Sequence, residues 1–265
     1  MTRTMRAGMT SVSGLWVFAL LHITAWAQSP DVLAVVSNAT FRSGRLAPGY
    51  IAAVFGTNLN DGSTVLSAFG ADSKLLTSLG GTSVRINNIP APLFYSTPQQ
   101  LGIQIPLELS GQSTATIQVA VGSQTSAPRA IVLDAFAPVL FESTRDFTGP
   151  PEAGAIFHED GVSPVTFESP ARQGEIILIY ALGLGSVTPP LATGAPSVGN
   201  LTVATPTVTI DGIAAEVKFS GTAPGFVGLY QINVKINAGI PGTLGTLVVS
   251  IGGARSDPVT IAVSP

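Results

Sequence analysis

GGTSVRINNIPAPLFY (residues 80–95) returns later in the chain as TPTVTIDGIAAEVKF (residues 205–219). In each copy, apolar and polar residues alternate up to a two-residue break, and a second strand-like run follows. The breaks are Asn87-Asn88 and Asp211-Gly212, and both pairs tolerate the positive φ angles of a type I′ hairpin turn. Each copy therefore predicts a β-hairpin.

The repeat extends on both sides of this hairpin and is about 95 residues long. Apolar residues alternate with other residues in the runs that follow, which is the period of a strand with one buried face. A glycine-containing turn, Gly122-Ser123 or Gly252-Gly253, follows the third matched run. The matched runs are APGYIAAVFGTNL (47–59) with RQGEIILIYALGL (172–184), QLGIQIP (100–106) with QINVKIN (231–237), and ATIQVAVGSQTSAPRAIVL (115–133) with GTLVVSIGGARSDPVTIAV (245–263).

The length and number of these runs predict the fold class. Each copy holds about six or seven short strands, with turn signals every 8–12 residues, as in an immunoglobulin-like β-sandwich of about 100 residues. No segment has a sustained helical period, and the repeat is too long for a β-propeller or a β-solenoid. We therefore predict an all-β protein of two tandem immunoglobulin-like β-sandwiches related by the internal repeat, with a short hairpin-bearing connector.

The first 27 residues have the pattern of an export signal. Arg3 and Arg6 precede the apolar run GLWVFALLHI (14–23), and the small-x-small motif at 25–27 predicts cleavage between Ala27 and Gln28. The alternative is an N-terminal membrane anchor, but the run of about 10 residues is short of the roughly 20 that a span requires. We expect an exported protein, periplasmic, cell-surface or extracellular, with no transmembrane segment in its mature chain.

Composition excludes several kinds of chemistry. The chain has no cysteine, so disulfides, thiol catalysis and thiolate metal sites are excluded. Beyond residue 27 it keeps fifteen acidic but only ten basic residues. The basic residues form no patch in the sequence, so a nucleic acid is not an expected partner. We predict no cofactor.

The sequence predicts four segments: the signal at 1–27, the first sandwich at 28–136, a connector with a β-hairpin at 137–171, and the second sandwich at 172–265. The connector has no copy elsewhere and holds six of the fifteen acids. Within it, AIFHEDG (155–161) carries His158, the only histidine after the signal. We interpret His158 as a solvent-facing residue beside a Glu159-Asp160-Gly161 turn, because one histidine cannot by itself form a zinc site or a catalytic triad.

The acids of the connector are the only candidate metal ligands. Carboxylates and backbone carbonyls bind calcium, and two carboxylates in a cleft can hydrolyse a glycosidic bond. The candidates for calcium are Glu142, Asp146, Glu152, Glu159 and Asp160. Their spacing matches no standard calcium loop, and no catalytic residue set is assigned.

Four stretches resemble a domain family of unknown function that is abundant in secreted acidobacterial proteins of the Solibacter type, often as their C-terminal part. They are SNATFRSGRLAPGYIAAVFGTNL, INNIPAPLFYSTPQQLGIQIP, ARQGEIILIYALGLGSVTPP and GTAPGFVGLYQINVKI. VFGTNL also resembles the opening of IPT/TIG immunoglobulin-like domains. The resemblance implies an exported immunoglobulin-like module and brings no catalytic residues with it.

These observations favour a non-enzymatic interaction or scaffold module that binds a protein or a glycan outside the cytoplasm. The alternative is a secreted hydrolase or a calcium-dependent binder that uses the acid-rich segment. The alternative requires the acids between residues 142 and 160 to converge in one cleft between the sandwiches.

Overall fold

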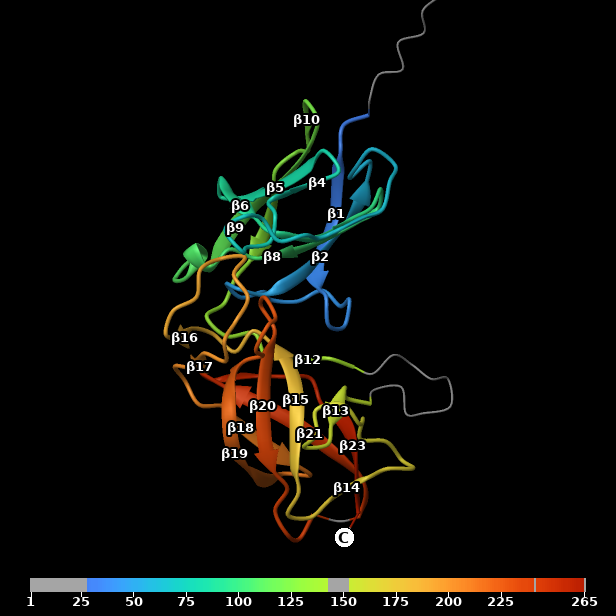
Figure 1. Ribbon diagram of the computed structural model, residues 1–265, viewed down its shortest axis with the longest axis vertical. Helices are drawn as coiled ribbons and strands as arrows, with labels where there is room; N and C mark the ends of the chain where they lie inside the picture. The colour runs from blue at the N-terminus through green and yellow to red at the C-terminus, as the bar shows by residue number, and fades with distance from the viewer. Residues whose placement is uncertain (1–27, 143–152, 241, 265) are drawn as a thin grey trace, which may run out of the picture.

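The computed structural model describes residues 28–142, 153–240 and 242–264. The predicted signal, including Ala27, and the calcium candidates Asp146 and Glu152 lie outside these residues. The described chain folds into two β-sandwiches, stacked end to end, which we call sandwich 1 and sandwich 2 (Figure 1). The predicted fold class is confirmed. Within the described ranges, no helix is long and apolar enough to cross a membrane.

Sandwich 1 consists of two facing sheets. The first has the order β1-β2-β8-β7-β3, and the second has the order β10-β9-β5-β4, with β11 added to β9 and β6 to β5. A short 3-10 helix, η1 (Leu107–Leu109), follows β8. The strands are β1 (Asp31–Ser37), β2 (Ile51–Thr57), β3 (Val65–Leu66), β4 (Ser78–Leu79), β5 (Thr82–Ile86), β6 (Ile89–Ala91), β7 (Leu93–Ser96), β8 (Gln100–Gln104), β9 (Thr114–Val121), β10 (Gln124–Thr125) and β11 (Arg129–Val132).

Sandwich 2 repeats this plan, but its long strand β19 pairs with β20 in one layer and with β18 in the other. The hydrogen-bonded path therefore runs through both layers as β12-β15-β20-β19-β18-β21-β23-β14. The strands are β12 (Val139–Leu140), β13 (Ile156–Phe157), β14 (Ala171–Arg172), β15 (Ile176–Leu182), β16 (Val187–Thr188), β17 (Leu201–Thr202), β18 (Thr207–Ile210), β19 (Ile213–Thr222), β20 (Tyr230–Lys235), β21 (Thr243–Ile251), β22 (Ala254–Arg255) and β23 (Val259–Ser264).

The two repeated hairpins have the turn geometry that the sequence predicts. Asn87 and Asn88 have φ angles of 48° and 65°, and Asp211 and Gly212 have 50° and 77°. The first turn residue also bonds to the neighbouring strand in both copies. The Asn87 side chain accepts a hydrogen bond from the Thr116 backbone N–H at 2.7 Å, and Asp211 accepts one from Thr246 at 2.7 Å. The side chain thus positions each hairpin against the next strand of its sheet.

A second repeated contact stabilises the turn at the end of each copy. Ser126 and Ser256 are both buried, 4% exposed. The Ser126 hydroxyl accepts a hydrogen bond from the Val119 N–H at 3.0 Å, and Ser256 accepts one from Val249 at 3.1 Å. Because an unpaired buried N–H is costly, the serine replaces a strand-to-strand bond where the chain leaves the sheet.

The segment 137–171, expected as a connector between the sandwiches, contributes strands to sandwich 2. β12 and β13 both pair antiparallel with β15, where β1 pairs with β2 in sandwich 1. The first strand of sandwich 2 is therefore β12 and β13 together, divided by the residues between Leu140 and Ile156. Further along, β14 pairs in parallel with β23. Part of the unrepeated sequence, between Leu140 and Ile156, is therefore an insertion within a strand that the repeat retains.

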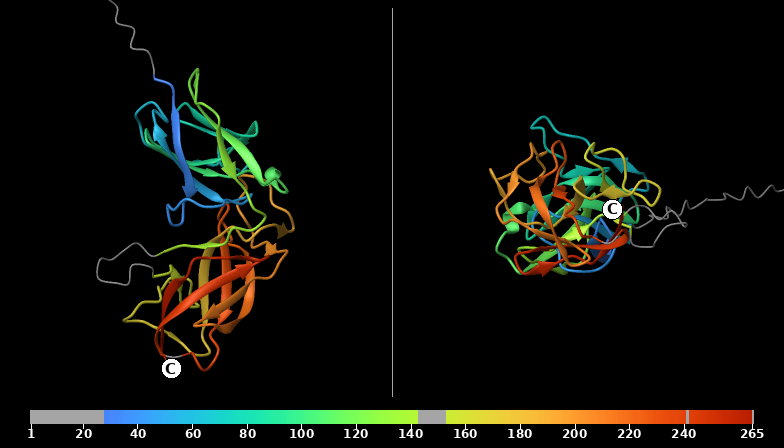
Figure 2. Two further views of the ribbon diagram at one scale, coloured as in Figure 1. Left: turned by 180° about the vertical axis from the view of Figure 1, so that it is seen from behind. Right: turned by 90° about the horizontal axis from the view of Figure 1, so that it is seen from below.

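The joint between the sandwiches is held by the β16–β17 loop, residues 189–200, which reaches sandwich 1 (Figure 2). The Gly194 N–H donates to the Gln104 side-chain oxygen at 2.7 Å, and the Gly194 carbonyl accepts from Leu75 N–H at 2.9 Å. The Thr193 hydroxyl accepts from Leu107 N–H at 2.9 Å and donates to the Glu108 carboxylate at 2.6 Å. Four hydrogen bonds thus connect one short loop to three segments of sandwich 1.

Close backbone approach completes the joint. A Cβ atom on Gly228 would lie 2.7 Å from the Gly49 carbonyl oxygen, and one on Gly183 would lie 2.1 Å from the Ala137 oxygen. Leu182 of sandwich 2 is fully buried in the hydrophobic core of sandwich 1. The contact is therefore packed like a protein interior, and this fixes the relative orientation of the two sandwiches.

Substituting Gly228 tests this close approach. Gly228 and Gly225 have φ angles of +72° and +83°, and a Cβ on Gly225 meets nothing within 4 Å. Alanine at either site costs about 1–2 kcal/mol for the left-handed backbone. We expect Gly228→Ala to lower the free energy of unfolding by about 1–3 kcal/mol more than Gly225→Ala does, because its methyl group separates the packed surfaces.

Differential scanning calorimetry of both variants measures the difference. The Gly225→Ala protein is the control for backbone strain. Equal melting temperatures for the two variants would show that Gly49 and Gly228 are not in close contact.

Candidate functional site

His158 follows β13 and begins a tight hairpin turn. Its carbonyl accepts a hydrogen bond from the Gly161 N–H at 2.9 Å, and Gly161 has a φ of +69°. Asp160 closes the turn by accepting the N–H groups of Val162 and Ser163, both at 2.9 Å, and the Ser163 hydroxyl at 2.6 Å. These bonds, that of the Ser163 hydroxyl above all, lower the pKa of Asp160 to about 2. Asp160 is therefore a charged turn residue.

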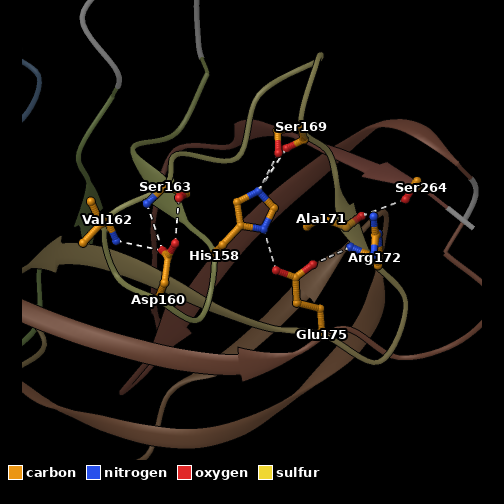
Figure 3. A network of polar contacts seen from close by, with 9 residues as sticks. All are labelled: His158, Asp160, Val162, Ser163, Ser169, Ala171, Arg172, Glu175 and Ser264. Atoms are coloured by element: carbon orange, nitrogen blue, oxygen red, sulfur yellow. Dashed lines mark hydrogen bonds and ion pairs between the residues drawn. The ribbon is translucent and has the colours of Figure 1, made fainter.

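The His158 side chain does not face solvent as expected from the sequence, because Glu175 covers it. The distance from His158 Nδ1 to Glu175 Oε1 is 2.5 Å, and the two side chains are only 18% and 19% exposed (Figure 3). Glu175 lies between β14 and β15, and its other oxygen accepts the Arg172 N–H at 2.8 Å. The partner is 17 residues away in the sequence, so the local pattern at residues 155–161 could not reveal it.

The other ring nitrogen of His158 also faces oxygen atoms. Nε2 lies 3.1 Å from the Ser169 carbonyl oxygen and 3.2 Å from the Ser169 hydroxyl. A carbonyl and a carboxylate only accept hydrogen bonds, so the pair of them favours a ring that carries a proton on both nitrogens. The hydrogen bond to Glu175 is the largest cause of a raised pKa at His158. The ring therefore acts as a charged link between the hairpin and the segment before β15.

The contacts of His158 resemble those in a serine hydrolase triad, with a serine hydroxyl beside one ring nitrogen and a carboxylate beside the other. In such a triad, the histidine accepts the serine proton through an unprotonated Nε2. Here the Ser169 carbonyl lies as close to Nε2 as the hydroxyl does and favours a proton on that nitrogen. The geometry suits an imidazolium that stabilises the fold better than a general base.

The structure separates the remaining acids of the predicted site. Glu142 lies at the joint, 3.1 Å from the Arg42 guanidinium, whereas Asp160 closes its hairpin turn and Glu159 is exposed. In the part of the chain that the structure describes, no three His, Cys, Asp or Glu side chains gather closely enough to hold a metal ion. Asp146 and Glu152 are outside that part, so their role as calcium ligands stays a prediction.

Two grooves lie at the joint, and both are lined by Asp134 and Phe136 of the segment that links the sandwiches. The first, with a volume of about 220 Å³, is lined by Arg42, Arg45 and Arg255, by Asp134 and Asp257, and by Phe136 among others. We call it the arginine groove. Arg45 is paired with Asp134 at 2.7 Å, and Arg42 lies 3.9 Å from Asp257. The buried ring of Tyr50 also lines this groove, and burial raises the pKa of its hydroxyl to about 12.

The second groove is larger, about 400 Å³, and we call it the neutral groove. Its lining is uncharged apart from Asp134 and includes Leu107, Gln112, Ser186 and Phe136. Phe136 lines both grooves. A Cβ on Gly185 or Gly252 would lie 2.5 or 2.2 Å from its ring, so these two glycines leave the space that the ring occupies.

The sequence did not indicate either groove, but one difference between the two repeats falls on residues of the arginine groove. Thr125 and Ala127 in the first copy correspond to Arg255 and Asp257 in the second, on the two sides of the repeated Ser126 and Ser256. At these two positions, the charges occur only in the second copy, where both residues line the arginine groove.

Comparison with known proteins finds no matching family model and no matching curated protein. Among solved structures, the chain is similar to an SGBP-B from the mixed-linkage glucan utilization locus of Bacteroides ovatus, in complex with a mixed-linkage heptasaccharide. The identity is 10%, over 90% of this chain and 47% of that one, with a TM-score of 0.38. An SGBP-B from a xyloglucan utilization locus in Bacteroides uniformis has 9% identity, over 89% and 50%, with a TM-score of 0.27. The I9–I11 tandem from titin has 8%, over 90% and 65%, with a TM-score of 0.23. This chain spans about half the length of the two SGBP-B chains.

The charged link at His158 makes stability depend on pH. Because the folded-state pKa is raised from 6.5, the contribution of the link is complete below pH 6.5 and is lost as the pH rises through the folded value. We expect His158→Gln to cost about 1.5–3 kcal/mol at acidic pH, the range for a hydrogen bond to a charged group. The difference from wild type should shrink at alkaline pH.

Urea denaturation of both proteins across pH measures this difference. Ser169→Ala is the control, because it retains the backbone carbonyl and should change stability little. A His158→Gln deficit that stays constant or grows with pH would contradict the imidazolium link.

Proposed function

We propose that the protein is a non-enzymatic binding module that works outside the cytoplasm and holds a protein or glycan ligand at the joint between its sandwiches. The observation that carries the proposal is the fixed joint: four hydrogen bonds of the β16–β17 loop hold it, and the segment that links the sandwiches lines two grooves there. Ligand sites favour such junctions because two surfaces provide a concave, preformed contact.

The state of His158 supports the non-enzymatic part of the proposal. A hydrolase built on Ser169 would require an unprotonated Nε2 on His158, and the Ser169 carbonyl, 3.1 Å from that nitrogen, favours a proton there. The location outside the cytoplasm is supported by the export pattern of residues 1–27. The four quoted motifs support membership of the Solibacter-type family of secreted domains.

Matched substitutions in the grooves test the proposal. Ser43 lines the arginine groove, Ser186 lines the neutral groove, and Ser123 lies in the β9–β10 turn of sandwich 1, away from both. All three are exposed, so tyrosine at each site should leave the fold intact. A ligand found for the purified protein on a glycan array or by pull-down of surface proteins should bind at least about tenfold more weakly to Ser43→Tyr or Ser186→Tyr.

Ser123→Tyr is the control and should bind like the wild type. Equal binding by all three variants would place the ligand elsewhere and contradict a site at the joint. Turnover of the bound ligand that is abolished by Ser169→Ala would contradict the non-enzymatic assignment.

A further inference from the structure

We propose that the arginine groove binds a hexuronate unit of an acidic glycan, with its arginines on the carboxylate and its aspartates on the sugar hydroxyls. The inference rests on the proposed function and names the ligand class for one of its two grooves. Three arginines line the groove and come from separate segments: Arg42 and Arg45 from the β1–β2 loop and Arg255 from β22. The β1–β2 loop belongs to sandwich 1 and β22 to sandwich 2, so the fixed joint brings them together.

The guanidinium groups retain free capacity for a ligand. Arg42 and Arg45 form their ion pairs through a single terminal nitrogen, Nη1, and Arg45 is 65% exposed. Within the described ranges, no acidic side chain lies within 4.0 Å of the Arg255 guanidinium. A guanidinium carries five N–H donors in a planar fork that matches a carboxylate, so Arg255 can take the anionic group of a ligand without breaking a pair.

The difference between the repeats supports a role in binding. A short strand follows β9 in sandwich 1 and β21 in sandwich 2, and a buried serine follows each of these short strands. Only the second copy carries Arg255 and Asp257 on either side of this serine, in place of Thr125 and Ala127. The hairpin of sandwich 1 forms without these charges, and in sandwich 2 both charged residues line the groove.

The rest of the lining distinguishes a uronate from other anions. Asp134 and Asp257 accept hydrogen bonds and would repel a dense polyanion, but they suit a ligand that brings hydroxyl donors beside one carboxylate. Thr40 and Ser43 also line the groove, and their hydroxyls can act as donors or acceptors. A volume of about 220 Å³ is below the 300–1,000 Å³ of sites for drug-sized ligands, so the groove suits a single sugar unit.

Calorimetric titration of the purified protein with uronate oligomers tests the inference. The probes are tetramers of galacturonate, glucuronate and mannuronate, each compared with the same tetramer after reduction of its carboxylates to hydroxymethyl groups. We expect at least one acidic tetramer to bind, and its reduced form to bind at least about tenfold more weakly. The binding should weaken as NaCl rises from about 20 to 500 mM.

Arg255→Gln should weaken uronate binding at least about tenfold. The matched control is Arg85→Gln, because Arg85 is an exposed arginine of sandwich 1 whose guanidinium bonds to the Asn88 carbonyl at 2.8 Å in its own hairpin. Circular dichroism and melting temperature verify that both variants fold.

Four outcomes would overturn the inference: no acidic tetramer binds, the reduced tetramers bind equally well, Arg85→Gln weakens binding as much as Arg255→Gln, or a tetra-aspartate peptide binds as tightly as the uronates. In each of these outcomes, the proposed function would still stand if a ligand found by the array or pull-down no longer bound to the Ser186→Tyr variant. Failure of both experiments would reject the two together.

Discussion

The relative position of the two sandwiches depends on backbone contact at their joint. The carbonyl of Gly49 in sandwich 1 lies where a side chain at Gly228 would begin. In the β16–β17 loop, the backbone N–H and carbonyl of Gly194 both form hydrogen bonds with sandwich 1. Contacts of this kind tolerate little displacement, because each hydrogen bond is short and each glycine leaves room for one neighbour only. Tandem domains joined by a few exposed side chains would be free to rotate. Here the joint has a buried core and defined grooves.

Charged side chains gather at this joint, although they are rare in the chain as a whole. Charged residues are sparse in this chain, 10% of its residues, yet three arginines and two aspartates line one groove of about 220 Å³. Arg255 and Asp257 belong to a turn whose counterpart in sandwich 1 is uncharged. The repeat thus provides an internal reference. Residues shared by both copies, such as Ser126 and Ser256, build the sandwich, whereas Arg255 and Asp257 occur only in the copy whose hairpin lies at the joint.

His158 shows how protonation decides between two interpretations of one geometry. By position alone, Ser169, His158 and Glu175 resemble a catalytic triad. The Ser169 carbonyl beside Nε2 changes the chemistry, because it favours a second proton on the ring and so removes the lone pair that a general base requires. The cluster then connects the hairpin after β13 to the segment before β15.

The sequence by itself determined the elements that depend on local pattern: the paired hairpins at Asn87-Asn88 and Asp211-Gly212, the buried alternation of β20, and the two-sandwich fold class. These follow from residue period and turn chemistry over a few positions. Only the tertiary structure decided which distant segments meet. It placed β12 and β13 in sandwich 2 as halves of one interrupted strand, set Glu175 against His158, and buried Gln104, a residue of an alternating strand, beneath Gly194. The physical reason is that each of these contacts depends on the shape of a packed interface, to which residues far apart in the chain contribute, and no local period encodes that shape.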